Sequence, residues 1–86
     1  MKYDDARADL DDLEGEMARS SCSLNHSQRS ETLRTLAILS RRALRATAGV
    51  ANEAEHRNEI EAVLDRIKSK LATSEQLEKL RELYRH

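Results

Sequence analysis

Arginine side chains recur along one face of the segment 26–48. If this segment is helical, Arg34, Arg41 and Arg45 project within about 40° of one another, with Arg42 beside them and Ile38 in their midst. Guanidinium groups in a row can hold phosphates or carboxylates in bidentate fashion. These five residues, the basic stripe, predict contact with an acidic protein surface or with nucleic acid. A solvated face, or one paired with the acidic N-terminal segment, is the alternative.

Acidic side chains form a ridge of opposite charge near the N-terminus. Asp5, Asp9, Asp12 and Glu16 follow one another at spacings of four, three and four residues, which places them on one helix face. Like charges at this spacing repel by about 0.2–0.5 kcal/mol per pair. This acidic ridge therefore favours a positive counterpart, either the basic stripe or an arginine-rich surface of a partner. The alternative is a solvated face whose charges suit the N-terminus of a helix.

Two smaller groups of residues could hold a metal ion or act in catalysis. Glu53 and His56 have the Glu-x-x-His spacing of diiron bundles, but such a site needs a second motif and two further carboxylates. Only an oligomer of this chain could supply them. Cys22 and His26 could pair as nucleophile and base, or as two ligands, yet the surrounding Ser-rich segment offers no third group. We expect a helix-end histidine and a free, inert thiol.

The residue patterns that enzymes require are missing from this sequence. It contains no glycine-rich phosphate loop, no cluster of zinc ligands and no pair of carboxylates that is predicted to be buried. The sequence therefore predicts a protein that is not an enzyme and that uses no cofactor or metal.

The composition is that of long helices with solvated faces. Charged residues make up 36% of the 86 residues, Pro is absent and only two residues are Gly. Apolar residues make up 38%, and Phe and Trp are absent, so the core must be thin and aliphatic. A partner chain that covered the remaining apolar stripes would help considerably, and we expect a homodimer.

The net charge of −1 conceals a segregation of charge along the chain. Residues 1–17 carry seven acids and two bases, residues 18–49 carry six Arg and one Glu, and residues 50–86 are mixed. Attraction between the first two segments is expected, within one chain or between two. A single cysteine, the lack of an apolar run of about 20 residues and the polar N-terminus predict a cytoplasmic protein that does not enter a membrane.

Apolar residues recur at helical spacing in four segments, at about 3–19, 26–48, 53–72 and 74–85. The residues predicted to form the apolar faces are Tyr3, Ala6, Leu10, Leu13 and Met17 in the first segment, Leu33, Leu36, Ser40, Ala43, Leu44 and Thr47 in the second, and Ile60, Val63, Leu64, Ile67 and Leu71 in the third. The last segment carries Leu77, Leu80, Leu83 and Tyr84, and it can cap the other helices or reach to another chain.

Local signals mark the ends of these segments. Capping-box spacing occurs at Asn25 with Gln28, at Asn52 with Glu55 and at Thr73 with Gln76, while Gly49 suits a left-handed helix end. The short connection at 49–51 predicts that the second and third helices lie antiparallel. The predicted fold is all-α, a single domain over residues 1–86. It is a small bundle built on an antiparallel helical hairpin, with three long helices and a short C-terminal one.

These features predict a non-enzymatic protein-protein interaction module, a bacterial or phage regulator or inhibitor that acts through its charged helix surfaces. Secretion cochaperones, plasmid copy-control hairpins and phage inhibitors such as anti-CRISPR proteins share this size and helical character, although no motif matches them residue by residue. One alternative is a dimeric nucleic-acid-binding regulator that uses the basic stripe. A small metal-binding helical bundle is the other.

Overall fold

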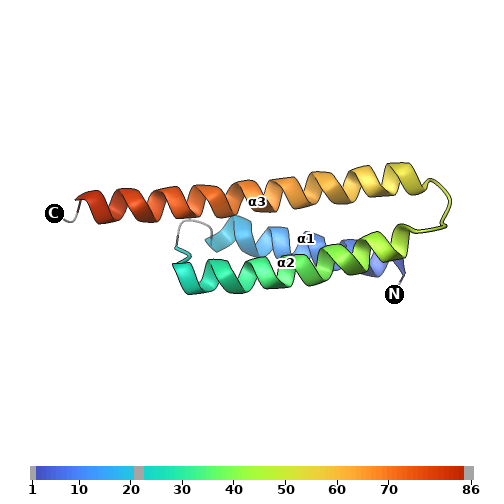
Figure 1. Cartoon of the computed structure of the whole chain (residues 1–86), viewed down its shortest axis with the longest axis horizontal. Helices are drawn as coiled ribbons and strands as arrows, with labels where there is room; N and C mark the ends of the chain where they lie inside the picture. Colours follow the sequence, from blue (N-terminus) through green and yellow to red (C-terminus); the bar gives the residue numbers. More distant parts are fainter. Residues whose placement is uncertain (1, 21–22, 85–86) are drawn as a thin grey trace.

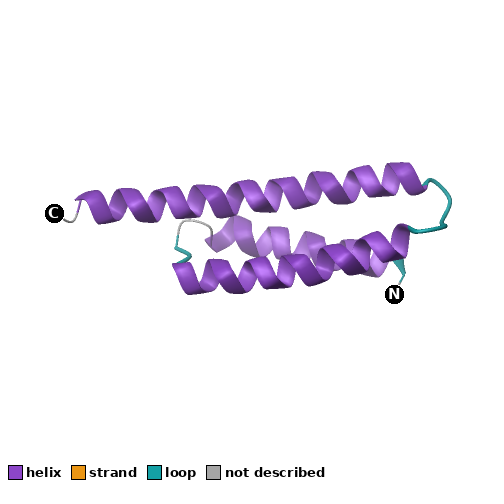
Figure 2. Cartoon of the chain, in the orientation of Figure 1, coloured by secondary structure: helices purple, strands orange, loops and turns teal. Residues whose placement is uncertain are grey.

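The computed structural model describes residues 2–20 and 23–84, which form three helices and no strand (Figures 1 and 2). These are α1 (Tyr3–Ser20), α2 (His26–Thr47) and α3 (Glu53–Tyr84). The prediction of an all-α fold is confirmed. The molecule is elongated, with extents of 55 × 18 × 17 Å.

The three helices lie side by side with their axes close to parallel (Figure 1). α1 and α2 run in opposite directions and are connected at one end of the molecule, and α2 and α3 are connected at the other end. Each helix packs against both of the others. The core therefore lies along the line where all three meet.

The core is a narrow row of apolar side chains that all three helices contribute. α3 supplies three fully enclosed residues, Ile60, Val63 and Ile67, each with no exposed surface. The predicted stripe of α1 is confirmed, because four of its five members are buried and Tyr3 is partly buried. The complete set of buried apolar residues is Ala6, Leu10, Leu13, Met17, Leu36, Ala43, Ile60, Val63, Ile67 and Leu71.

The prediction for α2 is wrong at two leucines. Leu33 and Leu44 were expected in the core, but they are 51% and 37% exposed. Leu36, Ala43 and Thr47 fill the buried face instead. The buried face of α2 is therefore narrower than expected, and leucines at the flank of the stripe stay in solvent.

The first predicted cap is present and the second is not. Asn25 is extended, its side chain accepts a hydrogen bond from the Gln28 backbone N–H at 2.9 Å, and the Gln28 side chain accepts one from the Asn25 backbone N–H. Gly49 has the expected positive φ, +76°. Asn52, predicted to cap the third helix, instead has a φ of 60°, outside the extended region that N-cap residues adopt.

The predicted break before a short C-terminal helix at 74–85 is wrong, because α3 continues without interruption to Tyr84. The Thr73 hydroxyl does not cap a new helix, since it donates to the Ser69 carbonyl one turn earlier at 3.0 Å. Ser74 is 2% exposed and lies against α2 and the connection before it. Nothing at this position favours a helix end over another turn, and residue 85 lies outside the described residues.

The C-terminal part of α3 projects past the other two helices (Figure 1). At about 1.5 Å per residue, the 32 residues of α3 span about 48 Å and the 22 residues of α2 span about 33 Å. The apolar side chains of this projection are exposed, at 47% for Leu80, 70% for Leu83 and 86% for Tyr84. They belong to the stripe of the predicted last helix, which was expected either to cap the other helices or to reach another chain, and within the described residues no neighbouring helix covers them.

The two glycines predict opposite effects on stability when replaced by alanine. A methyl group at Gly15 would lie 3.5 Å from the Arg19 guanidinium, an ordinary contact, and alanine favours a helix. We expect Gly15→Ala to raise the free energy of unfolding by about 0.5–1 kcal/mol. Gly49→Ala places an L-residue in the left-handed region and should lower it by about 1 kcal/mol. Urea denaturation followed by circular dichroism measures both, and two changes of the same sign would contradict the different backbone roles assigned to the two glycines.

A matched pair of leucines on α3 tests where the core ends. Leu71 is 6% exposed, so Leu71→Ala should lower the free energy of unfolding by about 2–4 kcal/mol. Leu83 is 70% exposed, and Leu83→Ala should change it by less than about 0.5 kcal/mol. Urea denaturation at low protein concentration separates the two, and a comparable loss in Leu83→Ala would show that the projection packs on the bundle.

Candidate protein-binding surfaces

The basic stripe lies on the outer surface of α2. Its residues follow one another at three- and four-residue spacing on the side away from Leu36 and Ala43, so the helix that buries those two residues turns the arginines to solvent. All five stripe residues are exposed, and Ile38 has 51% of its surface accessible. Within the described residues, none of the four arginine side chains has a hydrogen bond or an ion pair. The stripe is therefore a row of unneutralised guanidinium groups around one apolar side chain.

The acidic ridge lies along α1, on the flank that adjoins α2. Asp5, Asp12 and Glu16 are exposed and Asp9 is partly buried. In the part of the chain that the structure describes, none of these carboxylates forms an ion pair with a cation, those of the basic stripe included. The expected attraction between the first two segments therefore produces no ion pair between these two surfaces within one chain.

A shallow groove runs between α1 and α2 beside these charges. Its base is apolar, formed by Leu13 and Leu39, and three acids of the ridge stand at its α1 edge. The lining residues are Asp9, Asp12, Leu13, Glu16, Thr35 and Leu39. An apolar floor with an acidic rim suits an apolar side chain that is flanked by cations.

The opposite flank of α1 carries charges that do find partners, on α3. Glu14 accepts hydrogen bonds from both Arg66 nitrogens, Nε and Nη2, the second at 3.2 Å, and its carboxylate is 3.6 Å from the Lys70 ammonium. Such a bidentate pair fixes both side chains. The Arg66 hydrogen bonds lower the pKa of Glu14 below its usual value of 4.5, and Lys70 adds to the effect. Charges at the α1–α3 boundary thus serve the fold.

A second cluster joins the start of α1 to the start of α3. The Tyr3 hydroxyl donates to Glu59 at 2.6 Å, and Arg7 approaches the same carboxylate oxygen at 3.4 Å. These contacts lower the pKa of Glu59, with the Tyr3 hydrogen bond the largest cause. The Tyr3 and His56 rings lie 4.0 Å apart between centroids, and the buried His56 Nδ1 lacks a hydrogen bond. This cluster fastens the two helix ends together.

Arg29 is a buried charged residue that sequence analysis missed. Only 8% of it is exposed, and its guanidinium donates to the Leu24 carbonyl at 2.9 Å, to Ser74 Oγ at 3.4 Å and to Glu78 at 2.9 Å. The arginine thereby joins the α1–α2 connection to the last part of α3. The hydrogen bond from Arg29 lowers the pKa of Glu78. Arg29 lies seven residues before Leu36, so helical spacing could have predicted that it faces inward. Because arginine is seldom buried, its charge argued against that prediction.

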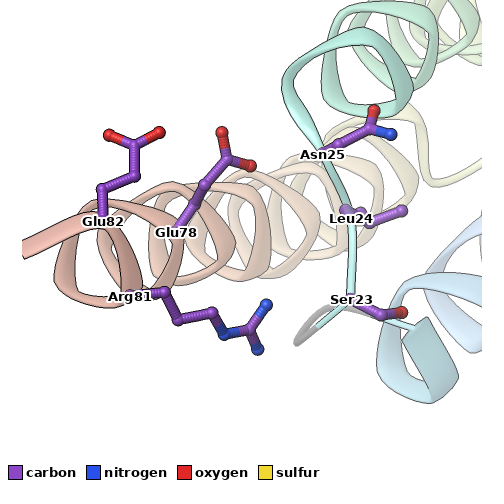
Figure 3. Close-up of a pocket in the computed structure, with 6 residues that line it drawn as sticks. All are labelled: Ser23, Leu24, Asn25, Glu78, Arg81 and Glu82. Carbon is purple, nitrogen blue, oxygen red and sulfur yellow. The ribbon is translucent and has the colours of Figure 1, made fainter. Parts of the chain in front are cut away.

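A polar depression lies where the α1–α2 connection meets the projection of α3. Figure 3 shows Glu78 and Glu82 on one side of α3, while Arg81 extends along the other toward the segment that carries Ser23. The remaining lining residues are Leu24 and Asn25. Glu78 is already held by Arg29, so the depression offers no free constellation for chemistry.

The candidate metal and nucleophile residues do not come together as a site. Glu53 accepts from Arg57 at 3.0 Å, and His56 stacks on Tyr3. No three His, Cys, Asp or Glu side chains in residues 2–20 and 23–84 are arranged as metal ligands. Cys22, expected to be a free thiol, lies outside the described residues. None of the described helices has the length and apolar character that crossing a bilayer requires.

No protein-family model, curated protein or solved structure matches this chain. The interpretation of its function therefore depends on the surfaces described above.

The paired carboxylates predict how stability depends on pH. The pKa values of Glu14, Glu59 and Glu78 are lowered in the folded protein, so their contribution is complete above the unfolded value near 4.5 and is lost as pH falls through the folded values. We expect the urea concentration at the midpoint of unfolding to decrease as the pH is lowered below about 4.5. At pH 7, the Glu14→Gln variant should unfold at a lower urea concentration than wild type. At pH 3, the midpoints of the two proteins should nearly coincide. A constant difference between the two proteins across this range would contradict the assignment.

Proposed function

We propose that this protein is a non-enzymatic interaction module, a small regulator or inhibitor that acts by binding another protein through the charged surfaces of α1 and α2. One observation carries the proposal. The arginine side chains at 34, 41, 42 and 45 are exposed and have no ion partner among the described residues, whereas Arg7, Arg29, Arg57 and Arg66 each have one.

The distribution of these pairs explains why the unpaired arginines suit recognition. Arginines that lie at a boundary between helices form ion pairs there with carboxylates of the same chain. The stripe projects from the outer surface of α2, and within the described residues its arginines form no ion pair with another helix. Four guanidinium groups around Ile38 combine charge with an apolar contact, and arginine is enriched at protein interfaces for this reason.

An acidic protein surface fits the stripe better than nucleic acid does. The net charge of the whole chain is −1, and the acidic ridge of α1 lies beside α2, where it would repel a phosphate backbone. The stripe also includes no aromatic side chain on which a base could stack. An acidic partner with an apolar residue to cover Ile38 meets both requirements.

Charge reversal on α2, compared with the same reversal elsewhere, tests the proposal. A partner protein is first isolated from the source cell by its binding to the tagged protein. Its affinity is then measured for the Arg41→Glu variant and for the Lys68→Glu variant, which changes an exposed lysine of α3. We expect Arg41→Glu to weaken binding at least about tenfold, because an attractive charge becomes repulsive, equivalent to ~1.4 kcal/mol. Lys68→Glu should change the affinity less than about twofold.

Two outcomes would contradict the proposal. Equal affinities for both variants would show that the stripe is a solvated face. A gel shift of duplex DNA at low salt that disappears as salt rises, and that Arg41→Glu abolishes, would replace the protein partner with nucleic acid.

A further inference from the structure

A groove with an exposed leucine runs between α2 and α3. Leu33 and Ser30 line it from α2, and Leu71 and Ala72 line it from α3. Leu33 keeps 51% of its surface accessible there. These four residues show which side of each helix borders the groove, so helical spacing places the other residues of this α2–α3 face.

Apolar surface continues along this face toward the α2–α3 connection. Leu44 follows Leu33 by eleven residues and Leu64 precedes Leu71 by seven, and at 100° per residue each lies within about 20° of its counterpart. Leu44 is 37% exposed and Leu64 is partly buried. Leu33, Leu44 and Leu64 therefore form an apolar strip, about 16 Å long on α2, that is partly open to solvent.

Cations border the apolar strip on α2. Arg41 follows Ser30 by eleven residues, so it lies within about 20° of that groove residue. Arg45 lies one turn farther along the helix. Both arginines, the basic edge, are exposed and form no ion pair within the described residues.

Carboxylates border the apolar strip on α3. Glu61 and Asp65 precede Ala72 by eleven and seven residues, which places each of them within about 20° of it. Both acids, the acidic edge, are exposed, and neither forms an ion pair in residues 2–20 and 23–84. The face thus has an apolar middle, one positive edge and one negative edge.

The two edges lie at the same height in the bundle. Arg29 of α2 donates to Ser74 of α3 at 3.4 Å, and the two helices run in opposite directions (Figure 1). Arg41 lies twelve residues after Arg29, so it is level with position 62, twelve residues before Ser74 and within the span of the acidic edge. Lys68, the lysine of this flank, lies about 9 Å farther along the axis.

A twofold axis parallel to the helices brings opposite edges of two copies together. Such a rotation places α2 of each copy over α3 of the other and keeps every residue at its own height. The basic edge then meets the acidic edge in both contacts, with the apolar strips between them. A twofold axis perpendicular to the helices would place α2 on α2 and α3 on α3, so like charges would meet. The charges therefore select the parallel axis, and the contact is self-complementary as in most homodimers.

We propose that the α2–α3 face binds the same face of a second copy of this chain, with the basic edge of each copy on the acidic edge of the other and the apolar strips between them. This inference rests on the proposed function, since it identifies a partner for two arginines of the basic stripe. The face is about 33 Å long and at most about 18 Å wide. That area is below the ~800 Å² per partner of stable complexes, so the dimer is weak and exchanges readily.

Sedimentation velocity over a range of protein and salt concentrations tests the dimer. The monomer has a mass of 9.8 kDa. At low ionic strength the weight-average mass should rise toward twice this value as the protein concentration increases. In about 1 M NaCl, where the screening length is ~3 Å, it should fall back toward the monomer mass. Wild type that stays monomeric at low ionic strength up to its highest soluble concentration overturns the proposal.

Charge exchange shows whether the two edges meet. Arg41→Glu with Arg45→Glu, and separately Glu61→Arg with Asp65→Arg, should each give a monomer, because like charges then face each other in both contacts. A mixture of these two variants should associate, and so should a chain that carries all four substitutions, because every contact again joins opposite charges.

Asp12→Arg with Glu16→Arg is the matched control, since it reverses two exposed acids at the same four-residue spacing on α1. This variant should dimerise as wild type does. Circular dichroism establishes that each variant is folded. If both edge variants still dimerise, or if their mixture and the four-substitution chain stay monomeric, the proposed contact is wrong.

The acidic edge separates this inference from the proposed function, because it belongs to neither of the surfaces proposed to bind a different protein. If charge exchange fails to restore association while Arg41→Glu weakens binding of an isolated partner protein, the dimer is wrong and the interaction module stands. If exchange restores association and Arg41→Glu leaves the affinity for every isolated partner unchanged, the dimer stands and binding of a different protein through the basic stripe is wrong.

Discussion

The arrangement of the molecule depends on one apolar line along α3. Ile60, Val63 and Ile67 have no exposed surface, and the stripes of α1 and α2 converge on them. The buried core contains no aromatic ring, and it consists of Leu, Ile, Val and Met side chains together with the small Ala6 and Ala43. Three helices around one narrow line leave most of each helix surface in solvent. The exposed surface is therefore large, and its charges determine what the molecule can do.

Charges divide into two groups according to their place relative to that line. At the α1–α3 boundary and near the start of α2, the polar side chains that adjoin the core find partners, as Glu14 does with Arg66 and Arg29 does with Glu78. Partly buried pairs of this kind limit the cost of placing a charge near an apolar core. The basic stripe and the acidic ridge lie farther out and have no such role. Their spacing is therefore free to serve an external partner.

Much of the fold could be predicted because local chemistry and packing agree. The stripe of α1 has regular spacing and becomes a buried face, and Asn25 with Gln28 forms the predicted capping box. The errors arise where two signals compete on one helix. In α3 the apolar residues after Ser74 occupy a face rotated away from that of Ile67, which is why they predicted a separate helix. Helical propensity continued the helix through this change of face, since no residue there breaks it.

The candidate surfaces were predictable in part for a related reason. Exposed positions follow from helical spacing, so the members of the basic stripe and the acidic ridge could be named from sequence. Whether two rows of opposite charge pair within a chain depends on the rotation of each helix about its own axis, which the core decides. Arg29 illustrates the limit, because its burial requires Ser74 and Glu78, which lie 45 and 49 residues away in sequence.

The same rotation determines where each charged surface lies. The core turns α1 so that one flank of acids meets α3 and the other adjoins α2, and it turns α2 so that the arginines face outward. The arginines and Ile38 therefore lie on the outer surface of α2, and the acids of the ridge lie on the flank of α1 that adjoins α2. Nucleic acid would meet repulsion from the carboxylates of the ridge. A protein surface is the one partner we propose that could match both signs of charge and also cover Ile38.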